Sequence, residues 1–201
     1  MAKIKFSKTE LKAQRDALKR FQRFLPTLQL KKQQLQMEIR RLSEVINKTQ
    51  QEFDEARQAI HDWISLFACE EAALLREQVR VQEVVLSTRN IAGVDIPVLD
   101  EVRFAPLTYD LFAASPWVDR AIEAFMRLLE LQIRRMVEEE QRRRIEEELR
   151  TTSQRVNLFE KVKIPECKEN IRVIQIYLGD QQTAGVGRAK IAKNKLVGQK
   201  G

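Results

Sequence analysis

The sequence has few of the residues that turn a chain or build a compact enzyme core. Six of its 201 residues are glycine and 6% are aromatic, whereas 32% are charged. The glycines stand at position 93 and from position 179 onward, so two long stretches lack the residue whose backbone turns most easily. This composition is typical of long helices. Two glycine-free arms around one interruption predict a helical hairpin.

Cysteine and histidine are equally scarce, which excludes several kinds of site. Cys69 and Cys167 build neither a disulfide framework nor a metal cluster, and we expect both to be reduced and semi-buried. His61, the single histidine, has no partner at metal-ligand or triad spacing and fits a helix surface. The carboxylates follow helix-surface periodicity rather than pairing in a dry pocket. We therefore expect no catalytic residue, no metal site and no cofactor.

Long apolar runs are also missing. No run of about 18 apolar residues occurs, and no signal-peptide pattern opens the chain. The text around Gly185 and Gly187 lacks the spacing of a phosphate-binding P-loop. These absences favour a soluble, cytoplasmic-type protein without a nucleotide site of its own.

Residues 7–80 are predicted to form the first arm of a long antiparallel two-helix coiled coil. Ser7 stands three residues before Glu10, a capping box that satisfies free amides at a helix start. Apolar residues then recur with a 3.5-residue period, which keeps one stripe facing a partner helix. Pro26 predicts a kink or short interruption without ending the arm. The seam residues here are Leu18, Phe21, Leu28, Leu35, Ile39, Leu42, Ile46, Phe53 and Ile60.

Residues 116–180 are predicted to form the second arm. Ser115 suits the capping position and Pro116 the first helical position. The apolar stripe slips by one residue after Phe159, and this stutter beside Pro165 predicts a bend or a change of twist. The seam residues here are Leu149, Val156, Phe159, Ile164, Ile171, Ile174 and Leu178.

Between Val137 and Leu149 the second arm is almost entirely Glu, Gln and Arg. We interpret this stretch as a solvated helix face held by pairs four residues apart, in the orientation that stabilises a helix. The alternative is a polar collar that serves as a docking site for another chain of a complex. The expected pairs are Glu138 with Arg142, Glu139 with Arg143, and Glu140 with Arg144.

Residues 81–115 are predicted to be the connecting tip, and residues 181–201 a basic tail. From Thr88 to Pro106, the alternating apolar residues and one glycine favour a short β-hairpin or extended loop. We expect it at the tip, opposite the end where both termini meet. The tail is either a solvated extension or an end inserted near an acidic partner surface, and its helicity stays open. All parts together predict a single elongated domain.

Four stretches, which follow the order of that family along the chain, resemble the D subunit of V-type rotary ATPases. Residues 155–165, RVNLFEKVKIP, resemble the C-terminal helix signature of that family, with its Arg-Val-Asn, its Glu three residues later and its Ile-Pro pair. Residues 90–97, NIAGVDIP, resemble its Asn-x-x-Gly-x-x-x-Pro turn. Residues 104–107 and 117–119 resemble its bacterial branch. The resemblance covers essentially the whole chain.

This resemblance implies a central rotor shaft. In that family the paired helix ends sit inside a ring of catalytic A and B subunits, the F subunit of the central stalk binds the side of the coiled coil, and a cap subunit of the C/d type joins the shaft to the membrane rotor. The chain is then a non-catalytic, cytoplasmic subunit, peripheral on the cytoplasmic face of the membrane. Under this hypothesis the ring-bearing contacts are Lys5, Lys8, Arg188, Lys190, Lys193 and Lys195.

Two other functions stay open. Heptads alone support a coiled-coil scaffold or tether with no rotary role equally well. The net charge of +7 also suggests a nucleic-acid-binding hairpin, but this needs aromatics interleaved with a basic stripe, and the aromatics here occupy the seam. The sequence leaves undecided whether a rotary complex containing this chain makes or consumes ATP, and whether it moves protons or sodium.

Overall fold

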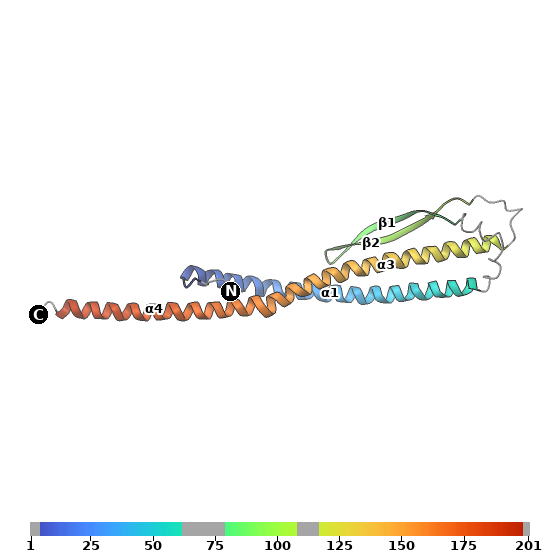
Figure 1. Cartoon of the computed structure of the whole chain (residues 1–201). Helices are drawn as coiled ribbons and strands as arrows, with labels where there is room; N and C mark the ends of the chain where they lie inside the picture. Colours follow the sequence, from blue (N-terminus) through green and yellow to red (C-terminus); the bar gives the residue numbers. More distant parts are fainter. Residues whose placement is uncertain (1–4, 62–78, 108–116, 199–201) are drawn as a thin grey trace. The chain divides into compact units, whose positions relative to one another are not determined.

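The computed structural model describes residues 5–61, 79–107 and 117–198 (Figure 1). In chain order they form helix α1 (Lys8–His61), strands β1 (Val81–Ile91) and β2 (Val94–Phe104), helix α3 (Val118–Leu158), a π-helical turn η2 (Phe159–Lys163) and helix α4 (Ile164–Gly198). The predicted fold class, two long helical arms with a short antiparallel hairpin between them, is confirmed. Ser115, Pro116 and Cys69 lie outside the described residues.

The chain divides into two compact units. Unit 1 contains residues 1–32 and 151–201, and unit 2 contains residues 33–150. Each unit therefore takes part of α1 and part of α3, and unit 2 alone contains the β-hairpin.

Helix α1 begins as its sequence predicts, and residues 62–78 of the predicted first arm lie outside the described residues. The amide of Glu10 donates to Ser7 Oγ at 3.2 Å, which confirms the capping box. Pro26 lies inside the continuous helix, so a short interruption there is excluded, and the alternative of a kink stays a prediction. A single missing amide donor leaves the neighbouring turns of a long helix intact.

The core of unit 2 joins three elements. Leu35 and Leu42 of α1, Ile96 of β2 and Ile145 of α3 form one buried cluster. Residues of the β-turn, together with Ile39 and Leu149, pack against it. The hairpin connects the two arms as expected, but its turn packs on the sides of the helices instead of extending beyond their ends. Burial of Ile96 is the physical reason, because an apolar strand face is stable only against other apolar surface.

The hairpin begins at Val81, earlier than the expected start at Thr88, and a tight turn closes it. Ala92 and Gly93 have φ values of 51° and 81°, as in the two-residue turn that matches strand twist. Asn90 Oδ1 accepts a hydrogen bond of 3.1 Å from the amide of Gly93. The resulting register pairs Ile91 with Val94.

Unit 1 contains the stutter that the sequence indicates. The amide of Ile164 bonds to the carbonyl of Phe159, so one extra residue is accommodated in the π-helical turn η2. Pro165 follows directly and has no amide to donate. The π-helical turn η2 is the local change of twist that the sequence predicts. Helix α4 then runs without a break to Gly198, which answers the open question about the tail.

Candidate interaction surfaces

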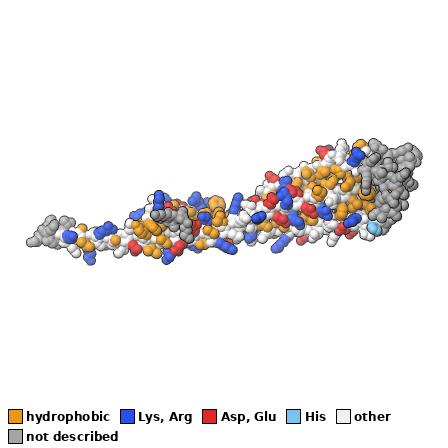
Figure 2. All heavy atoms as spheres, in the orientation of Figure 1, with side chains coloured by type: hydrophobic (Ala, Val, Ile, Leu, Met, Phe, Trp, Pro, Cys, Tyr) orange, Lys and Arg blue, Asp and Glu red, His pale blue; other side chains and the backbone are white. Residues whose placement is uncertain are grey.

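The final part of α4, residues 179–195, is a helix without a partner among the described residues. Ile174 is the last buried side chain of α4. The rings of Phe6 and Tyr177 lie 4.9 Å apart, near the end of the pairing between α1 and α4. Every residue from 179 to 195 is exposed. In Figure 2 this end shows Lys and Arg side chains among scattered hydrophobic ones.

The predicted ring-bearing cations are all exposed, and those of α4 are distributed around the helix. Arg188 and Lys195 are seven residues apart and therefore lie on one side, whereas Lys190 and Lys193 lie toward the other. Within the described part of the chain none of the four forms an ion pair. Lys5 and Lys8 are likewise exposed. All six residues belong to unit 1.

Two further features make this segment a poor helix on its own. Gly179, Gly185 and Gly187 lie inside it, and a Cβ added to any of them would meet no atom within 4 Å. Glycine in a helix interior costs about 1 kcal/mol relative to alanine. Val186 and Ile191 are 70% and 59% exposed. Because most helices owe their stability to packing of an apolar face, this segment lacks the usual source of stability.

The polar stretch of α3 forms a different ion-pair pattern from the predicted one. Glu140 pairs with Arg144 at 2.8 Å as expected, and also with Arg143 at 2.7 Å. The other two predicted pairs are wrong. Arg142 pairs with Glu146, and Arg143 reaches Glu147. Glu139 pairs with Arg135. Glu138 does not join these surface pairs because it points into the helix pair.

The hairpin covers part of the same stretch. Ile145 is fully buried in the core of unit 2. Gln141 Nε2 donates to the carbonyl of Pro97 at 2.5 Å, and Arg144 Nη1 donates to the carbonyl of Asp95 at 3.1 Å. The interpretation as a wholly solvated face is therefore wrong. The chain's own hairpin covers this part of α3, and the docking of another chain at a polar collar here stays a prediction.

A layer of polar side chains lies between α1 and α3 in unit 2. Glu138 is 9% exposed, and its Oε1 accepts a hydrogen bond of 3.2 Å from Thr49 Oγ1. Burial raises the pKa of Glu138, and the bond from Thr49 partly opposes that rise. Arg135 donates to Gln50 Oε1 and lies 5.7 Å from the ring centre of Phe53. These two side-chain bonds join α1 to α3 and would break if the helices slipped, so they favour one register, while Glu138 Oε2 and Arg135 Nε have no hydrogen-bond partner among the described residues.

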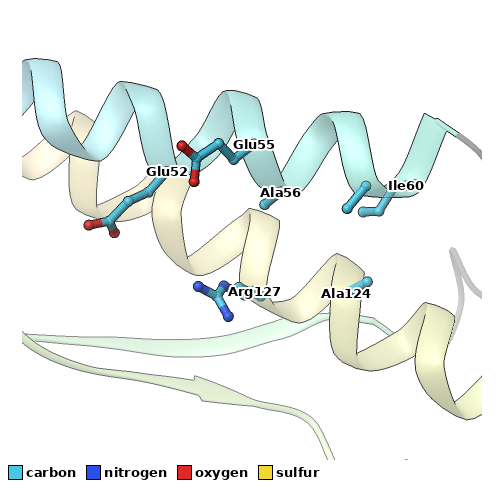
Figure 3. A pocket seen from close by; sticks show the side chains of 7 residues that line it. Glu52, Glu55, Ala56, Ile60, Ala124 and Arg127 are labelled. Atoms are coloured by element: carbon cyan, nitrogen blue, oxygen red, sulfur yellow. The ribbon is translucent and has the colours of Figure 1, made fainter.

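A hollow of about 300 Å³ opens between the last turns of α1 and the first turns of α3 (Figure 3). Small side chains, Ala56 and Ala59 of α1 and Ala124 of α3, leave the space, and Ile60 is buried beside it. Glu52, Glu55 and Arg127 provide its polar lining. The hollow combines apolar floor and both charge signs, which suits a protein partner better than a small charged ligand.

The predicted seam residues all lie at buried or half-buried positions. Those that are buried are Leu35, Leu42, Ile46, Ile60, Val156 and Ile174. Those that are half-buried are Leu18, Phe21, Leu28, Ile39, Phe53, Leu149, Phe159, Ile164, Ile171 and Leu178. The rings of Phe21 and Phe159 lie 5.0 Å apart across the helix pair.

No group suited to catalysis emerges from the described ranges. Cys167 is a free, buried cysteine, and burial raises the pKa of its thiol, which makes it a poor nucleophile. His61 is exposed on the last turn of α1. Among residues 5–61, 79–107 and 117–198 there is no cluster of His, Cys, Asp or Glu that could hold a metal ion. None of the helices in these ranges has a span apolar enough to cross a membrane.

Sequence reasoning missed the polar contacts that hold the hairpin. Gln141 and Arg144 were assigned to a solvent-facing surface, and their partners are backbone carbonyls more than forty residues away. The one signal available was Ile145, an isolated apolar residue in a charged stretch. It marks the side of α3 that the hairpin covers.

Comparison with known proteins gives a consistent result along the whole chain. A family model described as the D subunit of ATP synthase matches residues 10–194. The chain is 45% identical to the D subunit of V-type ATP synthase from Borreliella burgdorferi, over 98% of this chain and 96% of that protein. It is 33% identical to the protein of that name from Chlamydia muridarum, over 97% of each chain. With the one from Chlamydia pneumoniae the identity is 32%, over 96% of this chain and 93% of the other.

Proposed function

Because the chain belongs to the family of ATP synthase D subunits and is a stalk component of a rotary ATPase, we propose that it is the central rotor shaft. It couples ATP turnover in a ring of A and B subunits to rotation of the membrane rotor and so to ion transport. All ATP chemistry takes place in the ring, and this chain contributes no catalytic group. Its asymmetric surface biases each ring site toward an open or a closed state.

The unaccompanied end of α4 is the observation that carries this proposal. Residues 179–195 are exposed on every side, and their cations are distributed around the helix. A helix that docks on one flat surface needs one apolar stripe. A helix enclosed by a ring has partners in all directions and needs no such stripe. The three glycines support the same conclusion, because the segment gains its stability only when something surrounds it.

Positive charge gives this end its expected partner chemistry. Asp180 is the single acid between Gly179 and Lys195, against Arg188, Lys190, Lys193 and Lys195. We expect carboxylates on the lining of the ring to face these cations, with Lys5 and Lys8 adding to the same charge. Long-range attraction of this kind speeds association and weakens as salt is added.

A shaft must also transmit torque, and unit 2 has features that resist sliding between helices. The layer of buried Thr49 and Glu138 and half-buried Gln50 and Arg135 favours one register of α1 against α3. The hairpin adds the bonds from Gln141 and Arg144 to β2. Side-chain bonds of this kind make relative rotation of the two helices costly.

Two further partners complete the proposal. The F subunit of the central stalk binds the side of the helix pair, and the cap subunit of the membrane rotor binds the end of unit 2. The hollow between Ile60 and Ala124 supports the second assignment, because it lies at the helix ends and has an apolar floor. Beside it Val118, Ala121 and Ile122 form a buried apolar cluster.

The proposal is tested by reconstitution with the A–B ring of the same organism. The purified chain, with and without the F subunit, is mixed with the ring, and co-elution and ATPase turnover are followed. We expect one copy per ring and a changed turnover. A folded chain that never joins the ring would instead support a scaffold or tether without rotary role.

A charge-neutral variant tests the contacts of α4. Replacing Arg188, Lys190, Lys193 and Lys195 with Gln should weaken ring association roughly tenfold at low salt, with a smaller difference at high salt. A matched variant loses the same charge in the rest of the chain and should bind the ring like wild type. Its substitutions are Arg40→Gln, Lys48→Gln, Arg57→Gln and Arg120→Gln, all at exposed positions of unit 2. Equal loss in both variants would contradict a specific role for α4.

A further inference from the structure

The hollow between α1 and α3 has more acidic than basic side chains in its lining and has room for one long side chain. We propose that it receives an arginine side chain from the cap subunit of the membrane rotor. The guanidinium group binds Glu52 and Glu55, and the aliphatic stem packs on Ala56 and Ala124. Because the proposed function brings the cap subunit to this end of unit 2, the inference rests on it and adds the chemistry of the contact.

Unit 2 is the acidic part of a chain whose total charge is positive. Residues 33–150 contain 16 Lys and Arg against 23 Asp and Glu, which is a net charge of −7. Residues 1–32 and 151–201 contain 20 Lys and Arg against 6 Asp and Glu, which is a net charge of +14. Unit 2 therefore attracts a partner with a basic surface, although the whole chain carries +7.

Acids also outnumber cations at the hollow itself. The hollow is lined by two glutamates and one arginine. A second hollow of about 500 Å³ shares part of this lining, so four glutamates and two arginines surround the two hollows together. These residues are Glu52, Glu55, Glu123, Glu130, Arg127 and Arg134. The local charge thus has the same sign as that of the unit.

The two glutamates of α1 are available to a cation from outside. Glu55 is exposed and forms no ion pair with a described residue. Glu52 reaches Lys48 at 4.0 Å, the longest distance that counts as an ion pair. Arg127 lines the same hollow and pairs with neither glutamate within the described ranges. Because Glu52 and Glu55 are three residues apart, they lie on one side of α1, where a single cation can meet both.

The shape of the hollow favours arginine as that cation. About 300 Å³ is open beside small side chains and buried Ile60. In Figure 3 the carboxylates of Glu52 and Glu55 lie at one end of the hollow, and Ile60 and Ala124 lie at the other. Arginine has an apolar stem for such a floor, and its planar guanidinium group donates to two carboxylates at once, whereas lysine offers one compact ammonium group. Arginine is also enriched among the side chains that dominate protein interfaces.

A second copy of this chain is the competing occupant, because its unit 1 is strongly basic. In the proposed complex the catalytic ring encloses the end of α4, so the cations there face the ring instead of another unit 2. The cap subunit is then the partner that can supply a cation to the hollow.

Binding of the full-length chain to the purified cap subunit of the same organism tests the glutamates, by titration at low and at high salt. The double variant Glu52→Gln, Glu55→Gln should bind about tenfold more weakly at low salt, with a smaller loss at high salt. The matched control Glu44→Gln, Glu146→Gln removes two exposed acids of unit 2 that do not line the hollow, and should bind like wild type. Equal loss in both variants would overturn the proposal.

Filling the hollow tests the place of the aliphatic stem. Ala124→Leu puts a larger apolar side chain into the open space and should also weaken binding about tenfold, with the circular dichroism of the wild-type chain. Gln58→Leu adds the same side chain at an exposed position of α1 outside the lining and should bind normally. A folded Ala124→Leu variant that binds the cap subunit like wild type would contradict an arginine in the hollow.

A double-mutant cycle identifies the arginine. The arginines of the cap subunit are replaced by glutamine one at a time. One replacement should weaken binding to the wild-type chain about tenfold and leave binding to the Glu52→Gln, Glu55→Gln variant almost unchanged. If no arginine shows this coupling, the inference fails and the shaft function stands. A chain that binds neither the cap subunit nor the A–B ring would overturn both.

Self-association of the free chain is followed in the same preparations. We expect the wild-type chain and the Glu52→Gln, Glu55→Gln variant to have the same oligomeric state. Concentration-dependent dimers that form in the wild type and are lost in this variant would identify a second copy as the occupant and contradict the cap subunit.

Discussion

Two polar helical stretches of this chain differ in composition and in surroundings. Residues 138–148 of α3 and residues 179–195 of α4 are both helical and strongly polar. The first includes buried Glu138, Gln141 and Ile145 and is covered by the hairpin. The second has no buried residue. One stretch has its partner within the chain, and the other has none among the described residues.

The pattern of charges along each helix accounts for part of this difference in surroundings. In α3, carboxylates and guanidinium groups four residues apart support the helix from within, as between Glu140 and Arg144. In residues 179–195 of α4 four cations stand against the single acid Asp180, none of these cations forms an ion pair with a described residue, and glycines weaken the helix further. Mixed charge lets a helix gain from pairs within itself, whereas a helix whose charges are nearly all of one sign lacks that gain.

The largest expected effect comes from truncating one apolar residue in each stretch. Ile145→Ala should lower the free energy of unfolding by about 2–5 kcal/mol, because the side chain is fully buried in the core of unit 2. Ile191→Ala is the matched change in α4 and should stay within about 0.5 kcal/mol, because that side chain is largely exposed. Urea denaturation of both variants measures the contrast, and equal losses would refute it.

Substituting glycine should strengthen the weaker stretch. Gly185→Ala and Gly187→Ala should each stabilise helix α4 by about 1 kcal/mol in the free chain, because a Cβ there meets nothing within 4 Å. Circular dichroism and amide exchange of residues 179–195 would record the gain in helicity. Gly93→Ala is the opposite case, since its φ of 81° disfavours any side chain. Destabilisation of α4 by either alanine would argue against an unpacked helix.

Two glutamates two residues apart in α3 should titrate in opposite directions. Burial raises the pKa of Glu138 above its ordinary value of 4.5, while Arg143 and Arg144 lower the pKa of Glu140 to about 2. Carbon-detected NMR titration of the side-chain carboxyls measures both. Similar midpoints for the two would contradict the difference in their surroundings.

The same shifts set the sign of two small pH effects. Folded Glu138 holds its proton to a higher pH than the unfolded chain does, so its ionisation lowers stability as pH rises above 4.5. Glu138→Gln should therefore remove this loss and be relatively more stable at neutral pH than below pH 4.5. Glu140 contributes stability above pH 4.5 that disappears as pH falls toward 2. A Glu138→Gln variant with an unchanged pH profile would refute the first effect.

Local patterns in the sequence predicted most of the helical structure. The Ser7 cap, the seam period and the slip after Phe159 each depend on residues within a turn or two of one another, and each appears in the structure. The hairpin was predicted from the glycine at its turn and from the alternation of apolar residues on either side of it. Such features need no knowledge of distant contacts.

What the sequence did not reveal depends on contacts between distant residues. Ile96 meets Leu35 and Ile145, and no local rule states that the hairpin turn packs against the sides of the helices. The predicted ion pairs of Glu138 with Arg142 and of Glu139 with Arg143 are wrong. They were predicted from spacing alone, which pairs each glutamate with the arginine four residues later. Which face of α3 is covered by α1 decides the actual contacts. On the covered face Glu138 is buried against Thr49, and Glu139 pairs with Arg135 instead of Arg143.

In the proposed complex the catalytic ring surrounds the end of α4. Amide exchange across residues 179–195, measured in the free chain and in the chain assembled with the A–B ring, tests it most directly. The account predicts fast exchange throughout this segment in the free chain and slow exchange on all sides of the helix once the ring is present. Exchange that stays fast in an assembled complex would contradict it.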